Sequence, residues 1–318
     1  FDQSLSYESR DLLESFSASG YVDITRVARS YQEENRAIDS GQAKVGIIFP
    51  PDFADNIKRG IPSPVQVIVD ASDNMVANQA MAIANSIGLI RSQEILAQRI
   101  NIQGPPYDIR VRAWYNPDGI TAWYMVPAIM GIVVTMSMVI MTAVAIVRER
   151  ERGTLEQLLV TPIRPYELML GKILPYIGLG YVQITVALLV GVLVFNVPIR
   201  GSILELYLLT MFFITASLGL GIMISNLARN QMQAFQMAFF VMLPSIMLSG
   251  FLFPRDGMPR IIYYLGEIIP LTYYLDIIRG IVLKGIGFSY LVGQVTMLLV
   301  FSVVFLIIST ARFKKRII

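Results

Sequence analysis

Five long apolar runs occupy most of the chain after residue 119. A helix needs roughly 20 apolar residues to cross a hydrocarbon core of about 30 Å. The pattern therefore predicts five membrane-spanning helices, at about Trp123–Val147, Leu168–Phe195, Ile203–Leu227, Met232–Phe253 and Tyr290–Ala311. The segment 254–288, between the last two runs, is interrupted by prolines and charges, and its apolar runs are too short to span.

Residues 1–118 follow a different pattern, in which short β-prone runs alternate with helical ones. This pattern predicts a small α/β domain. We expect strands at Tyr21–Val27, Lys44–Phe49, Val65–Asp70 and Ile109–Tyr115, and helices at Tyr7–Ala18, Tyr31–Asp39, Pro51–Arg59 and from about Asn74 to Ile102. The segment carries no phosphate-binding loop, metal-ligand spacing or carboxylate pair. A structural or gating role is therefore favoured over direct contact with a substrate or partner.

Composition supports this division into two domains, 1–118 and 119–318. Hydrophobic residues make up 54% of the chain and charged residues 15%, against about 25% charged in soluble domains. The chain has no Cys and no His, which excludes disulfides, thiol nucleophiles, Ser-His catalysis and the usual zinc sites. Its basic excess lies in short clusters beside apolar runs, so nucleic-acid binding is not expected.

The placement of Lys and Arg predicts the orientation. Dense basic clusters at 148–152 and 312–316, with Arg164 and Arg229, mark the cytoplasmic side by the positive-inside rule. The C-terminus is then cytoplasmic, and residues 1–118 are extracytoplasmic. A folded domain that precedes the first span must be delivered across the membrane, so we expect one earlier helix and six spans in the full protein.

The segment that joins the first two spans is the most informative one. A span continues into the charged stub Arg148–Arg152, which ends at Gly153. Thr154 and Gln157 fit a capping box that starts a short helix, and Pro162 ends it. Leu155, Leu158 and Leu159 give this helix an apolar stripe. Such a helix can lie on lipid or fit a groove of a partner protein.

The string Gly153-Thr-Leu-Glu-Gln-Leu-Leu-Val-Thr-Pro162, followed by Arg164-Pro-Tyr-Glu-Leu-Met-Leu-Gly-Lys172, resembles the signature of type-2 ABC exporter permeases. The resemblance extends from about Trp123 to Arg316, and the large outer domain is similar to that of bacterial multidrug-type permeases. It implies an α-helical polytopic membrane domain, an outer re-entrant hairpin near 254–288, and a coupling helix near 153–162 that docks into a separate ATPase subunit. The coupling residues it implies are Glu149, Glu151, Gly153, Thr154, Leu155, Glu156, Leu158, Leu159 and Pro162. Without the resemblance, a generic interfacial helix is an equal interpretation.

The source of energy follows from what the sequence lacks. No Gly-x-x-x-x-Gly-Lys-Ser/Thr loop occurs, so ATP and Mg²⁺ are expected on the partner ATPase, with no cofactor or metal on this chain. An ion gradient usually requires ionisable groups at mid-depth. The five predicted spans contain none there. ATP hydrolysis by a partner therefore fits better, and the chain itself is not expected to be an enzyme.

Polar side chains within the spans are candidates for lining a pathway between two permease copies, or between this chain and a homologous permease. Packing within one subunit is the favoured alternative for them. These candidates are Thr135, Ser137, Gln183, Thr210, Thr215, Ser245 and Ser249.

Three functions remain open. The sequence favours a permease of the bacterial inner membrane that moves a hydrophobic drug-like or lipid-like molecule outward, with a periplasmic adaptor as a further candidate partner. A permease relative that uses ATP to drive an outer domain mechanically is the alternative. An intramembrane enzyme would need a nucleophile with a base, or paired acids, at membrane depth, and the spans offer only Lys172 near such a depth.

Overall fold

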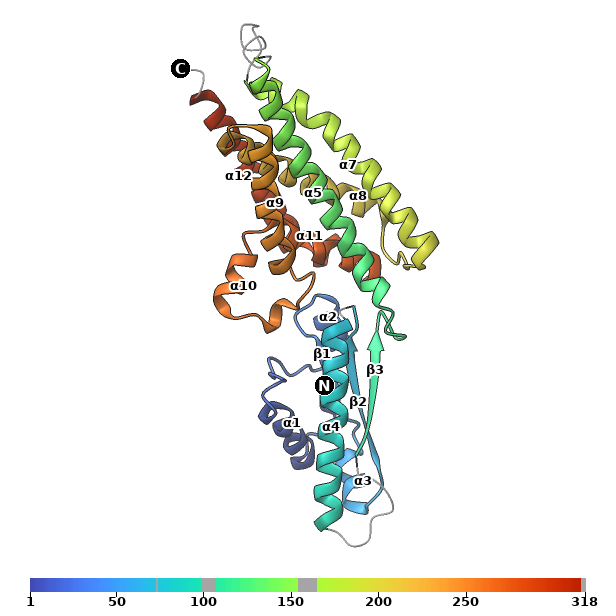
Figure 1. The fold of residues 1–318 in the computed structure, drawn as a ribbon. Coiled ribbons are helices and arrows are strands. Elements are labelled where there is room, and N and C mark those ends of the chain that lie inside the picture. Colours follow the sequence, from blue (N-terminus) through green and yellow to red (C-terminus); the bar gives the residue numbers. More distant parts are fainter. Residues whose placement is uncertain (73, 99–106, 154–164, 316–318) are drawn as a thin grey trace. The chain divides into compact units, whose positions relative to one another are not determined.

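The computed structural model describes residues 1–72, 74–98, 107–153 and 165–315 (Figure 1). The chain divides into two compact units, Phe1–Thr121 and Ala122–Ile318. Each unit has its own hydrophobic core. They are therefore considered one at a time.

The first unit contains a three-stranded sheet with the order β1-β2-β3. Strand β1 (Val45–Ile48) runs antiparallel to β2 (Ser63–Asp70), and β2 runs parallel to β3 (Tyr107–Trp114). Because parallel neighbours need a long crossover, helix α4 (Asn74–Gln98) lies in the connection between β2 and β3 and packs on both strands. Helices α1 (Tyr7–Ala18), α2 (Tyr31–Asp39) and α3 (Phe53–Arg59) complete the unit.

Alternation along β2 builds the core of this unit. Val65, Val67 and Val69 are fully buried at every second position, as expected for a strand with one face toward a core. They pack with Leu12 and Phe16 of α1 in one cluster. The sheet and α1 are thereby held together by apolar burial.

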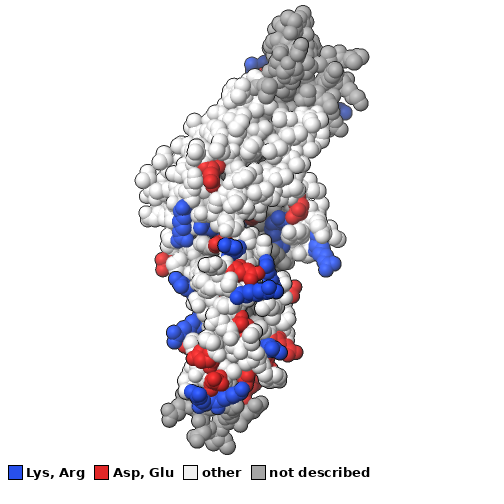
Figure 2. Space-filling model, turned by 180° about the vertical axis from the view of Figure 1, so that it is seen from behind, with Lys and Arg blue, Asp and Glu red and all other residues white. Residues whose placement is uncertain are grey.

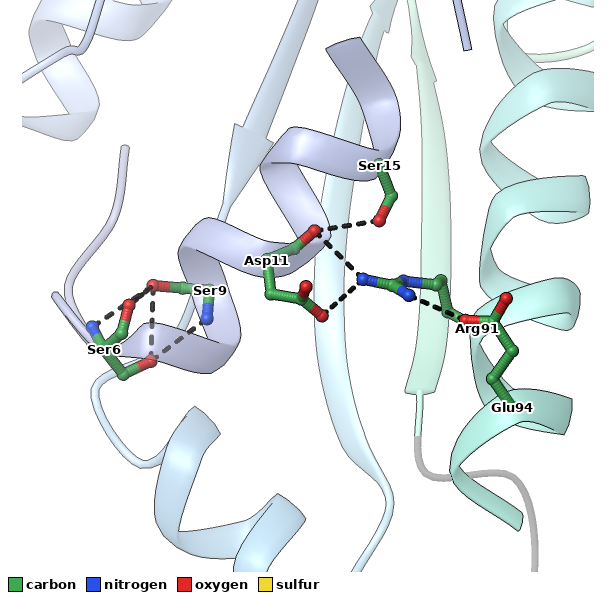
Figure 3. A network of polar contacts seen from close by, with 6 residues as sticks. All are labelled: Ser6, Ser9, Asp11, Ser15, Arg91 and Glu94. Carbon is green, nitrogen blue, oxygen red and sulfur yellow. Dashed lines mark hydrogen bonds and ion pairs between the residues drawn. The ribbon is translucent and has the colours of Figure 1, made fainter. Parts of the chain in front are cut away.

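A polar contact fastens α1 to α4 beside this core (Figure 3). Arg91 of α4 pairs with the carboxylate of Asp11 in α1, and it also binds Glu94 on its own helix at 2.7 Å. Ser15 donates to the Asp11 carbonyl at 2.8 Å. At the start of α1, Ser6 and Ser9 form a capping box. The guanidinium thus links two helices that lie far apart in the sequence.

The predicted strand at Tyr21–Val27 is wrong. These residues form no bridge with any described strand, and most of them are exposed. The first residues of the chain lie beside the end of β1 instead, where Asp2 bridges Phe49 and Gln3 donates to the Phe49 carbonyl. The helix expected from Pro51 begins at Phe53. The helix expected to reach Ile102 is described to Gln98, and its last predicted residues lie outside the described part.

The second unit has a helix at each of the five predicted spans. They are α5 (Thr121–Glu151), α7 (Pro165–Phe195), α8 (Ile203–Leu227), α9 (Gln231–Leu248) and α12 (Val292–Lys315). The first four are long and apolar enough to cross a membrane, while the described apolar stretch of α12, Val292–Ile308, is shorter. Helix α9 ends five residues before the predicted Phe253. The polytopic helical fold is confirmed, with the small sheet in the other unit.

Residues 254–288 form a bent helix pair, here called the hairpin. Helix α10 (Arg260–Gly266) is followed by α11 (Pro270–Arg279), which continues as a π-helical turn to Lys284, and the two arms meet at 82°. Helix α11 is buried among the long helices. Its Tyr274 is fully buried and stacks on Phe213 of α8, with the ring centroids 3.8 Å apart. The second arm of the hairpin is therefore part of the core of the bundle.

Helix α8 lies at the centre of the bundle, because glycines let its neighbours approach closely. A β-carbon added at Gly221 would lie 2.8 Å from the Val139 carbonyl oxygen of α5, and one added at Gly219 would lie 2.7 Å from Phe305 of α12. Ser302 of α12 also donates to the Phe212 carbonyl of α8 at 2.8 Å. Close approach through small residues and interhelical hydrogen bonds are the usual means of helix association in lipid.

The visible face of this helix bundle is largely without charged side chains (Figure 2). Helices α7 and α9 expose most of their apolar residues, since 22% of the apolar stretch of each is buried, against 67% in α8. Such faces require an apolar medium. The lipid bilayer supplies one.

Candidate functional site

Helix α5 ends in the charged stub that the sequence singles out. Its last turn closes with a hydrogen bond from the Gly153 amide to the Arg150 carbonyl at 3.2 Å. Gly153 then adopts a positive φ of 70°. Glycine is the residue that ends a helix in this left-handed conformation without a steric penalty. The stub is thus helical up to Glu151, and a turn leads to Gly153, the last described residue of this segment.

Arg150 binds the end of α8. Its guanidinium donates to the Ser225 carbonyl at 3.3 Å and to the Ala228 carbonyl. The last carbonyls of a helix lack partners within the helix and carry partial negative charge. A guanidinium supplies both the hydrogen-bond donors that these carbonyls lack and a positive charge opposite their partial negative charge. Arg150 therefore caps the C-terminal end of α8 from a different helix.

The next residue, Glu151, binds the start of α9. Its carboxylate accepts a hydrogen bond from the Gln231 amide at 3.0 Å and another from the Gln231 side chain. Gln231 is the first residue of α9, where amide groups lack partners within the helix. Asn230 caps the same end by accepting from the Gln233 amide at 2.7 Å. The two consecutive stub residues thus hold both sides of the short turn between α8 and α9.

Small apolar residues pack beneath these polar contacts. Several of these residues are alanines, which let α5, α8 and α9 approach one another closely. We call this region, together with Arg150, Glu151 and the turn Ala228–Asn230, the junction. Its buried cluster consists of Val139, Ala143, Val147, Ile224, Ala228, Ala234 and Ala238.

Three of the predicted coupling residues lie in the described part of the chain. Glu151 belongs to the junction, and Gly153 lies at the end of the stub. Glu151 accepts its hydrogen bonds from Gln231 of α9, and its coupling role stays a prediction. Glu149 lines a cavity of about 200 Å³ between α5, α7 and α8, together with Thr142 and Tyr176. The other predicted coupling residues lie outside the described residues: Thr154, Leu155, Glu156, Leu158, Leu159 and Pro162.

The seven pathway candidates are spread over α5, α7, α8 and α9, and none is among the residues that line this cavity. Most of their hydroxyls donate to carbonyls of their own helix. Ser137 and Gln183 are half-buried on α5 and α7. A pathway lined by these residues stays a prediction. The hydroxyls bonded within their own helix are those of Thr135, Thr210, Thr215, Ser245 and Ser249.

Thr210 makes a further contact, which reaches the hairpin. Its hydroxyl lies 3.0 Å from the hydroxyl of Tyr274, the buried residue of α11. The hairpin is also closed on itself, since Arg255 binds Glu267 at 2.8 Å and Tyr273 donates to the same carboxylate at 3.1 Å. Charged side chains within the hairpin therefore pair with each other.

Sequence reasoning missed the partners of the stub. Arg150 and Glu151 look like a solvated charged face, which is the usual role of such a run. The one available signal was the motif Asn230-Gln-Met-Gln233, which caps a helix directly after a span. A helix start at that place offers amides to an acidic side chain.

The comparison with known proteins identifies the family. The model of a family described as ABC-2 family transporter protein matches residues 1–311. The chain belongs to the ABC-2 transporter family. As an ABC-2 chain with several apolar helices, it is a multi-pass membrane permease.

Curated relatives are similar over most of this ABC-2 permease. The probable multidrug ABC transporter permease YbhS of Escherichia coli is 34% identical over 95% of this chain and 78% of its own length. The probable multidrug ABC transporter permease YbhR of the same organism is 29% identical over 100% of this chain and 86% of its own length. The inner membrane transport permease YhhJ of E. coli is 31% identical over 90% and 76%.

We expect Arg150→Gln to destabilise the membrane unit. Losing hydrogen bonds from a charged donor costs about 1.5–3 kcal/mol, and two carbonyls at the end of α8 lose their partner. Arg152→Gln is the matched control, because Arg152 is exposed on the same stub. Thermal unfolding of the purified proteins in detergent measures the difference. Equal stability of the two variants would show that the Arg150 contacts contribute nothing.

Proposed function

We propose that this chain is the permease subunit of an ATP-driven exporter in the bacterial inner membrane. The observation that carries the proposal is the family match over residues 1–311, joined to the signature that begins at Gly153. The stub before Gly153 is fastened to two further helices. A push on the segment 153–162 therefore has a defined mechanical route into the bundle.

ATP and Mg²⁺ bind a separate ATPase subunit in this proposal. The sequence contains no Walker-type loop, and the coupling helix near 153–162 docks into the ATPase. Two copies, or this chain and a homologous permease, enclose the pathway. Closure of the ATPase subunits on ATP draws the coupling helices together and tilts the spans.

The proposed cargo is a hydrophobic drug-like or lipid-like molecule that moves outward. Two relatives carry the name probable multidrug ABC transporter permease, which favours transport over the mechanical alternative. The apolar surfaces of the spans suit such a cargo better than a highly charged one. A periplasmic adaptor that binds the extracytoplasmic unit is a further proposed partner.

Leu158→Asp tests the docking of the ATPase. A charge in the apolar stripe 155–159 is expected to reduce co-purification of the partner ATPase at least tenfold, while the permease still inserts in the membrane. Ile61→Asp is the control, because Ile61 is exposed in the first unit. ATPase association that is unchanged by Leu158→Asp would remove the support for the coupling assignment.

Cysteine labelling from outside the cell tests the orientation. The chain has no native Cys, so Ser86→Cys and Ser289→Cys each introduce a single thiol at an exposed position. We expect a membrane-impermeant maleimide to label both, and to label Thr154→Cys only after the cells are opened. Labelling of Thr154→Cys alone in intact cells would reverse the topology.

A further inference from the structure

We infer that α9 is a transmission rod that carries the movement of the coupling segment from Glu151 to the hairpin, with Glu151 as the positioning residue at its driven end. The inference rests on the proposed function, because an ATPase must supply the movement. It assigns a role to a helix and a residue that neither the family match nor the names of the relatives assign.

The position of Glu151 supports this role. The C-terminal end of a helix carries partial negative charge, so a carboxylate in the last turn of α5 is unfavourable to α5 itself. The N-terminal end of α9 carries the opposite charge and offers the Gln231 amide at 3.0 Å. Glu151 thus disfavours its own helix and favours a neighbouring one. Its placement is explained by the connection between the two helices.

The C-terminal end of α9 is also held in place, by contacts with α5 and with the hairpin. The Gly250 carbonyl, just beyond α9, accepts a hydrogen bond from Tyr124 of α5 and one from Arg279 of α11, each at 3.2 Å. Arg279 also lies over the Tyr124 ring, 3.8 Å from its centroid. A β-carbon added at Gly266 of α10 would lie 2.6 Å from the Leu248 carbonyl oxygen. Both arms of the hairpin therefore contact the C-terminal end of α9 or the residue just beyond it.

Between its two ends, α9 is buried along one face and exposed along the rest of its surface. Only 22% of its apolar stretch is buried within the described part of the unit, and Phe240 is 76% exposed. A helix of 18 residues is about 27 Å long at 1.5 Å per residue. Its backbone hydrogen bonds make it stiff along the axis, and through its middle one face, with Ala234, Ala238 and Met242, is buried while the other is exposed. A displacement at Gln231 is consequently passed to Leu248 and to the hairpin.

The experiment follows the hairpin in the complete permease–ATPase complex. Ile261→Cys places the single thiol of the chain on α10, where Ile261 is 77% exposed, and an environment-sensitive fluorophore is attached to it. We expect ATP with vanadate to change the fluorescence in the labelled parent and in the Arg152→Gln control. Glu151→Ala is expected to reduce this change at least fivefold while the ATPase stays bound. Glu151→Gln is expected to give an intermediate change, because an amide oxygen can still accept from the Gln231 amide.

The results distinguish a transmission role of α9 from a role of Glu151 at the ATPase contact. A full fluorescence change in Glu151→Ala, or an unchanged signal in a labelled parent that hydrolyses ATP, would overturn the rod. Loss of the ATPase from Glu151→Ala would also overturn it, since Glu151 would then act at the ATPase contact. Absence of any ATPase bound to the parent would instead contradict the proposed function.

Discussion

The structure of the membrane unit depends on two consecutive side chains that bind opposite ends of two other helices. Arg150 holds the electronegative end of α8, and Glu151 holds the electropositive start of α9. Charge-assisted hydrogen bonds to helix ends are among the stronger polar interactions available to a protein. Because both side chains come from the last turn of α5, the cytoplasmic end of this helix is bound to both α8 and α9. An ATP-driven partner needs such a connection.

The packing of the other helices determines where the proposed movement at the end of α5 is passed. Helix α8 is packed against α5 and α12 through Gly221 and Gly219, so it lies at the centre of the bundle. Helix α9 is buried along one face only and ends against the hairpin. The hairpin in turn places Tyr274 in the core beside Thr210. In the proposed mechanism, movement at the junction reaches this buried element, in which a small shift must be accommodated by the packing around it.

Much of the fold could be predicted from the pattern of apolar residues, because a bilayer imposes both a length and a composition on every span. The small α/β domain was also predicted, apart from Tyr21–Val27, where a β-prone run pairs with no described strand. The candidate site was less predictable. The sequence indicated that residues 148–153 were important, but Gln231 lies 80 positions from Glu151. Only the packing of α5 against α8 and α9 brings the two together.

Cross-linking across the junction tests the central claim most directly. Glu151→Cys and Gln231→Cys introduce the only pair of thiols in the chain, and a short bifunctional maleimide joins them in the complex with the ATPase. If α5 and α9 move as one body, the cross-linked permease keeps its vanadate-sensitive ATPase activity and its transport of a fluorescent dye, whereas the same double variant without the cross-linker transports poorly. Loss of transport on cross-linking would contradict the account, because it would mean that the two helices must separate during each cycle.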